Sequence, residues 1–157
     1  MQHSIGIAIK KANNALARDS DHFAKKIGLT GMQISTINYI ADHENTQDIF
    51  QQDLEHEFNI RKATASSLVT TMVANELLIR VPATEDARYK RLLLTPKARQ
   101  LATVIAAFFA ESEQRIKTLL GASTATTYTD LTKLSQAFTT APTPKKGPQQ
   151  THEPTVS

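Results

Sequence analysis

The stretch from Asn59 to Ala98 limits the possible folds of this chain more than any other segment. It begins with a predicted helix, residues 61–75, which has small polar side chains on one face and apolar side chains on the other. Two short apolar segments follow, Leu77–Val81 and Arg91–Leu94, and a polar loop from Pro82 to Lys90 joins them as in a β-hairpin. A helix followed by a basic hairpin indicates a winged helix-turn-helix. In that fold the helix enters the major groove of DNA and the hairpin lies against the backbone or the minor groove.

Positive charge is concentrated in this same stretch. Between Arg61 and Arg99, eight basic and three acidic side chains give a net charge of +5, whereas the whole chain carries only +3. Phosphate contacts supply much of the affinity of DNA-binding proteins, so this distribution favours a DNA surface. A basic hairpin that is merely solvated is the alternative, and the order of helix, strand, Asp-x-Arg and strand makes it the weaker one.

The candidate DNA contacts lie at the start of helix 61–75, on its small-residue face and in the hairpin loop. Arg61 and Lys62 suit phosphates, and short hydroxyl side chains let a helix approach base edges closely. Asp86 can hold the guanidinium of Arg88 in one pose, and an arginine at a loop tip can enter a narrow minor groove. A solvated helix face and a weak surface ion pair are the alternatives. The predicted contact set is Arg61, Lys62, Ala63, Thr64, Ser66, Ser67, Thr70, Asp86, Arg88 and Lys90.

Two more helices are predicted between residue 30 and helix 61–75. Thr30 and Gln33 are spaced for a capping box, so one helix begins after Thr30 and runs to about residue 43. Thr46 is expected to cap a second helix, Gln47–Phe58, whose acidic face would repel phosphate and should therefore support helix 61–75. We expect Asn75 to take the left-handed conformation that ends helix 61–75.

Apolar stripes at both ends of the chain predict helices that need a partner surface. They run through residues 5–27, 96–120 and 124–139, with Thr95 as a cap before a proline at the first helical position of the second. In a small domain such a partner is often another subunit. Residues 141–157 are rich in Pro, Lys, Gln and Thr, and are expected to be disordered.

Several functional classes are excluded or disfavoured by what the sequence lacks. There are no cysteines, no apolar run near the ~20 residues that cross a bilayer, and no apolar signal-peptide core. A cytoplasmic protein without membrane contact is therefore expected. No glycine-rich phosphate loop or nucleophile motif is present, so we expect neither an enzyme nor a cofactor. No two of the five histidines are spaced as a helical ligand pair, which disfavours a metal site.

The landmarks described above occur in an order that is typical of one family. They are Leu29-Thr30-x-x-Gln33, Thr64-Ala65-Ser66, Leu68-Val69, Leu77-Leu78-Ile79-Arg80, Asp86-Ala87-Arg88 and Leu94-Thr95. Together they resemble the MarR family of bacterial transcription regulators, over about residues 5–139. Three departures are Glu76 and Ala98, where the family often has glycine, and Ser67, where it often has arginine. Direct guanine reading is accordingly expected to be weaker.

The resemblance implies a mainly α fold with a small β-hairpin wing, a winged helix-turn-helix flanked by N- and C-terminal dimerisation helices. The implied segments are a dimerisation helix at 1–28, a DNA-binding lobe at 29–95, dimerisation helices at 96–140 and the tail at 141–157. It also implies a homodimer that binds a pseudo-palindromic operator in double-stranded DNA. It further implies repression or activation by occupying promoter DNA, with repression relieved by a small-molecule effector as the expected mode of action.

Three points stay open at the level of sequence. An effector pocket between the dimerisation helices and the DNA-binding lobe would draw its walls from Leu16, Phe23, Ile37, Phe108 and Phe109, unless these are ordinary core residues. A winged helix used only for protein interaction is the first alternative function. A metal-responsive regulator is the second, because His43 and His56 lie near carboxylates.

Overall fold

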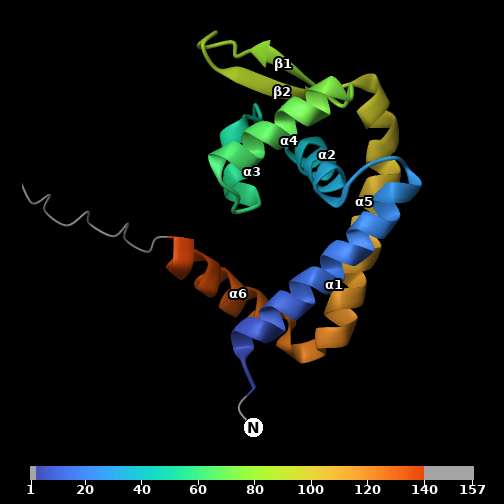
Figure 1. Cartoon of the computed structure of the whole chain (residues 1–157), viewed down its shortest axis with the longest axis vertical. Helices are drawn as coiled ribbons and strands as arrows, with labels where there is room; N and C mark the ends of the chain where they lie inside the picture. Colours follow the sequence, from blue (N-terminus) through green and yellow to red (C-terminus); the bar gives the residue numbers. More distant parts are fainter. Residues whose placement is uncertain (1–2, 140–157) are drawn as a thin grey trace, which may run out of the picture. The chain divides into compact units, whose positions relative to one another are not determined.

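A computed structural model of the chain describes residues 3–139. In chain order these residues form α1 (Ile5–Lys26), α2 (Gly31–His43), α3 (Gln51–Glu57), α4 (Lys62–Ala74), β1 (Leu78–Pro82), β2 (Lys90–Leu94), α5 (Pro96–Leu120), the 3-10 turn η1 (Gly121–Ser123) and α6 (Thr124–Thr139) (Figure 1). The chain divides into two compact units between Thr118 and Leu119. The predicted tail at 141–157 lies outside the described residues.

One apolar core joins α2, α3, α4, the hairpin and α5. Its fully buried side chains include Ile37 from α2, Leu54 from α3, Met72 from α4, Leu78 from β1 and Ile105 from α5. Burial of a large aliphatic side chain stabilises a fold by ~1.5–3 kcal/mol, so such a core holds these elements in one arrangement. The position of α4 relative to the hairpin is thereby fixed.

The start of α2 confirms the capping-box prediction. The Thr30 hydroxyl accepts from the backbone N–H of Gln33 at 3.3 Å, and the Gln33 side-chain oxygen accepts from the backbone N–H of Thr30 at 3.1 Å. A second acceptor comes from α1, where Asp21 Oδ1 accepts from the N–H of Gly31 at 2.9 Å. These bonds satisfy N–H groups that a helix start leaves without intrahelical partners, and the last one ties α1 to α2.

The third helix is shorter than predicted, and its cap is different. It begins at Gln51 rather than Gln47, and Asp53 Oδ2 accepts from the backbone N–H of Phe50 at 2.7 Å. Thr46 instead donates its hydroxyl to the carbonyl of His43 at 3.0 Å. The physical reason for the late start is a non-local bond, because the carbonyl of Ile49 accepts from the N–H of Leu92 in β2 at 2.7 Å.

The hairpin was predicted to within one residue at each strand end. β1 and β2 are antiparallel, with Leu78 opposite Leu94 and Arg80 opposite Leu92. Leu78, Leu92 and Leu94 are buried, whereas Ile79 on the other face of β1 is 45% exposed. The hairpin therefore packs one face on the core and leaves the other face to solvent.

The turn between α4 and β1 differs from the prediction for Asn75. Asn75 has a φ of −87°, and the left-handed conformation falls on Glu76, with a φ of +59°. Residues other than glycine rarely adopt the left-handed conformation. The Thr95 hydroxyl supports the turn by donating to the Glu76 carbonyl at 2.7 Å. A left-handed residue was thus correctly expected in this turn, but it is Glu76 and not the preceding Asn75.

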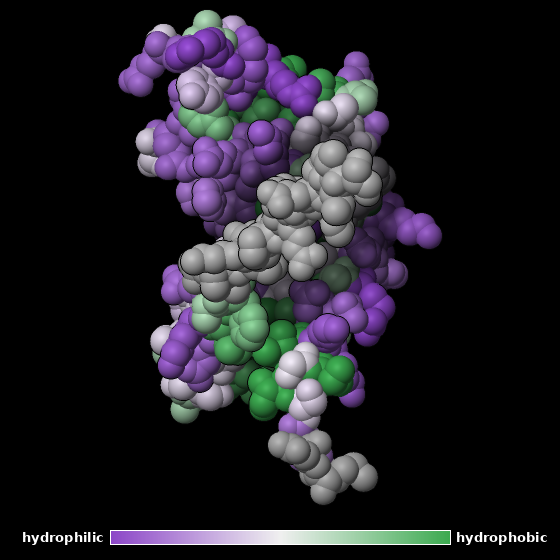
Figure 2. Space-filling view, turned by 60° about the vertical axis from the view of Figure 1, so that its left-hand side comes forward, coloured by the Kyte–Doolittle hydropathy of each residue, from purple (hydrophilic) through white to green (hydrophobic). Residues whose placement is uncertain are grey.

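Large apolar side chains of the terminal helices remain exposed in a single chain. On α1, Ile5 and Leu16 are 70% and 47% exposed. On α6, the stripe of Tyr128, Leu131 and Phe138 is also exposed, with Phe138 at 80%. The space-filling view likewise shows apolar surface reaching solvent (Figure 2). These stripes match the predicted need for a partner surface.

Candidate nucleic-acid interface

Helix α4 presents its small polar residues to solvent. Ala65, Val69 and Met72 are fully buried, which turns the opposite face of the helix outward. All seven predicted contacts at or on this helix are exposed: Arg61, Lys62, Ala63, Thr64, Ser66, Ser67 and Thr70. No long side chain stands on this face beyond the first turn, so the helix can come close to base edges.

The start of α4 is suited to an anion. Arg61 is the N-cap residue, and its side chain makes no capping hydrogen bond. Lys62 follows at the first helical position, and both side chains are exposed. Free N–H groups and the positive end of the helix dipole attract phosphate, and two adjacent cations strengthen that attraction.

The wing tip holds the predicted pair of Asp86 and Arg88. Nη2 of Arg88 donates to Asp86 Oδ2 at 2.7 Å, and its Nε lies 3.1 Å from both carboxylate oxygens. The backbone N–H of Arg88 also donates to Asp86 Oδ1 at 3.0 Å. The Arg88 side chain is nevertheless 86% exposed. The carboxylate therefore sets the pose of a guanidinium that is open to a ligand.

This pair is insensitive to pH in the neutral range. The side-chain hydrogen bond from Arg88, followed by the bond from its backbone N–H, lowers the pKa of Asp86 below the ordinary carboxyl value. The same bond raises the pKa of Arg88. A lowered carboxyl pKa means that the pair is complete above the ordinary value and is lost only as pH falls through the lowered one.

Lys90, also in the predicted contact set, supports the wing loop. Its ammonium donates to the carbonyl of Ala87 at 3.1 Å, which closes the wing loop. Two backbone bonds tighten the same loop, from Ala83 to the Tyr89 carbonyl and from Tyr89 to the Asp86 carbonyl, at 2.8 and 3.1 Å. Lys90 is exposed, so it supports the loop and still adds positive charge to its surface.

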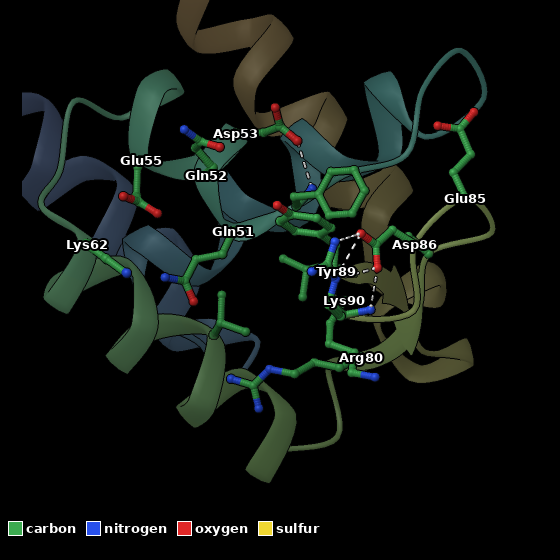
Figure 3. A pocket seen from close by; sticks show the side chains of 15 residues that line it. Gln51, Gln52, Asp53, Glu55, Lys62, Arg80, Glu85, Asp86, Tyr89 and Lys90 are labelled. Carbon is green, nitrogen blue, oxygen red and sulfur yellow. Dashed lines mark hydrogen bonds and ion pairs between the residues drawn. The ribbon is translucent and has the colours of Figure 1, made fainter.

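An open groove of about 900 Å³ runs between α3, α4 and the hairpin (Figure 3). Lys62 lies on its α4 side, and Arg80, Arg88 and Lys90 come from the hairpin. Its α3 wall carries polar residues, Gln51, Gln52, Asp53 and Glu55. The groove brings together four predicted contacts, Lys62, Asp86, Arg88 and Lys90, and adds residues that were not predicted.

Arg80 is the main residue that sequence reasoning missed. Its Nη2 donates to the Thr70 hydroxyl on α4 at 3.1 Å, which links the wing to the helix. Strand alternation could have indicated its position. Arg80 is two residues after the buried Leu78 and therefore lies on the same face of β1.

The predicted effector-pocket residues separate into two groups. Phe23 stacks on Phe108 with ring centroids 4.3 Å apart, and Ile37 is fully buried, so these three belong to the packed interior. Leu16 and Phe109 line an open pocket of about 620 Å³. Its other walls are Ser20, Asn38, Asp42, Ala106, Ala110, Ser112, Glu113 and Ile116.

Residues 3–139 show neither a group of metal ligands nor a membrane-spanning helix. Within these residues, no three side chains of the metal-ligating kinds lie close enough together to hold an ion. The His43 ring stacks on Tyr39 at 4.3 Å, and its Nδ1 lies 2.8 Å from the Tyr39 carbonyl. None of the helices in this part of the chain has the length and apolarity that a bilayer span requires.

A mainly helical lobe with an exposed α4 and a two-stranded wing defines a winged helix-turn-helix protein, and the comparisons give its family. The family model described as "MarR family" matches residues 27–88. The transcription regulator MarR from Oenococcus oeni PSU-1 is 32% identical, with a TM-score of 0.74, over 86% of this chain and 98% of that one. The chain belongs to the MarR family.

More distant structures share the fold. The S. aureus MepR–DNA complex is 20% identical with a TM-score of 0.77, over 87% of this chain and 99% of that one. The transcriptional regulator SlyA is 17% identical with a TM-score of 0.73, over 87% and 95% of the two chains. No curated protein matched the sequence.

Proposed function

We propose that this protein is a homodimeric, sequence-specific DNA-binding regulator that represses transcription by occupying promoter DNA. The observation that carries the proposal is the exposed face of short side chains on α4 beside an open, ion-paired Arg88 on the wing. A helix of this kind fits the major groove, and an arginine at a loop tip fits the negative potential of a narrow minor groove. The similar fold of MepR, which was solved in complex with DNA, supports this use of the surface.

A second copy of the chain would supply the partner for the exposed stripes of the terminal helices. The apolar residues of α1 and α6 are too exposed for a stable monomer surface of this size, and a two-fold axis would bury the same stripe on both copies. Such a dimer places two α4 helices on half-sites about one DNA turn apart. Relief by a small ligand belongs to the same proposal, with the pocket lined by Leu16 and Phe109 as its site.

The dependence of DNA affinity on salt is a direct test. If Arg61, Lys62 and Arg88 of each subunit displace counterions, log K should fall with log salt with a slope of about −5 or steeper, a loss of about a thousandfold or more between 50 and 200 mM salt. The probe is the tightest-binding duplex of about 30 base pairs that the wild-type protein selects from a randomised pool, and fluorescence anisotropy gives the affinity. Affinity that does not change with salt, or no selected duplex at all, would exclude DNA binding as the function.

A further inference from the structure

Arg80 spans the space between the wing and α4. In the hairpin register it lies opposite the buried Leu92, so its side chain leaves β1 on the side of the core. Figure 3 shows the side chain of Arg80 extending from the hairpin toward α4. Its Nη2 donates to the hydroxyl of Thr70 on that helix at 3.1 Å. Arg80 and Thr70 are both exposed, so this bond stands at the surface and not in the core.

The bond with Thr70 occupies only part of the guanidinium. Arginine has five N–H donors in a planar fork, and the Thr70 hydroxyl is the acceptor that residues 3–139 provide for Arg80. Arg80 lines the same groove as Lys62 and Lys90, and the carboxylates in that lining are Asp53, Glu55, Glu85 and Asp86. A planar fork with a fixed orientation suits the oxygens of a phosphate.

The position of Arg80 indicates which phosphate it would meet. With α4 in a major groove and the wing tip at the adjacent minor groove, the DNA strand that separates the two grooves passes between α4 and the hairpin. Arg80 bridges these two elements at the level of Thr70. A guanidinium there faces the sugar-phosphate backbone and not the base edges.

We propose that Arg80 clamps a phosphate of the strand between the two grooves, and that Thr70 is a positioning residue that orients Arg80. This inference rests on the proposed DNA-binding function and revises the role expected for Thr70. The Thr70 hydroxyl accepts from Arg80 and orients its guanidinium. Thr70 therefore contributes to affinity for DNA of any sequence and does not read a base. The remaining short side chains of α4 keep the base-reading role.

The test compares Arg80→Ala, Thr70→Val and the double variant on the selected duplex and on a random-sequence duplex of the same length. Arg80→Ala should weaken binding to both duplexes by about 5- to 30-fold and make the salt slope shallower by about 2 units per dimer, one phosphate for each subunit. Thr70→Val, which keeps the shape but removes the acceptor, should weaken both duplexes equally and by less. The double variant should bind within about twofold of Arg80→Ala, because the two residues act as one unit.

Two results would overturn the inference. One is an unchanged salt slope in Arg80→Ala, and the other is a Thr70→Val variant that loses affinity for the selected duplex alone. Arg80→Lys is the matched variant, since it keeps the charge and should keep the slope while it loses the fork. If the wild-type protein binds DNA and Arg80→Ala binds equally well, only the clamp is refuted. If the wild-type protein binds no duplex, the proposed function is refuted as well.

Discussion

Replacing Arg88 by alanine is expected to weaken binding to the selected duplex at least about 30-fold, because a dimer loses two arginine contacts to DNA of about 1 kcal/mol or more each. The guanidinium is 86% exposed at the wing tip, and Asp86 holds it in one pose. An exposed ion pair adds little to stability, so the melting temperature should stay within about 2 °C of wild type. Fluorescence anisotropy and thermal unfolding measure the two quantities.

Arg115→Ala is the control for this prediction. It also removes one exposed arginine, from α5, without touching α4 or the wing. If charge alone mattered, both variants would weaken binding equally. We expect Arg115→Ala to bind within about twofold of wild type, as a distant charge is screened beyond ~10 Å. Equal affinities for Arg88→Ala and Arg115→Ala would show that the wing does not contact DNA.

Leu131→Asp is expected to dissociate the dimer and lower DNA affinity at least about a hundredfold. Leu131 lies in the exposed stripe of α6. If a second copy covers this stripe, a carboxylate there would be buried without a partner, which costs several kcal/mol. A monomer also keeps only one of two half-site contacts, so the loss in affinity follows from the loss of assembly. Light scattering should give about the subunit mass of 17.3 kDa for the variant and about twice that for wild type.

Thr126→Asp adds the same carboxylate to α6 at an exposed polar position about half a helical turn from the stripe. It lies near the helix start, where a negative charge is favourable, so the helix itself should not weaken. We expect a dimer with wild-type affinity. If Leu131→Asp remained dimeric as well, α6 would not form the interface.

The sequence predicted those elements whose signals are local. The Thr30 cap with Gln33 and the start of α5 at Pro96 follow from spacing within one helix, and both were confirmed. The strand ends were placed to within one residue because strand alternation is also local. Helical and strand periodicity need no knowledge of the rest of the fold.

The errors occurred where a distant residue decides the local structure. α3 starts late because Ile49 bonds to Leu92, which lies far along the chain, and a cap signal at Thr46 cannot reveal that bond. Arg80 was missed for the same reason, since its importance comes from the approach of β1 to α4. The candidate site was therefore anticipated in its helix and wing tip, but not in the contact that joins them.

The central claim is that two copies present paired α4 helices and wings to one face of DNA, and hydroxyl-radical footprinting on the selected duplex tests it most directly. The expected result is two protected patches on each strand, related by two-fold symmetry, with centres about 10 base pairs apart and with wing protection in the flanking minor grooves. A single unsymmetrical patch, or no protection at about 50 mM salt, where phosphate contacts are strongest, would contradict the claim.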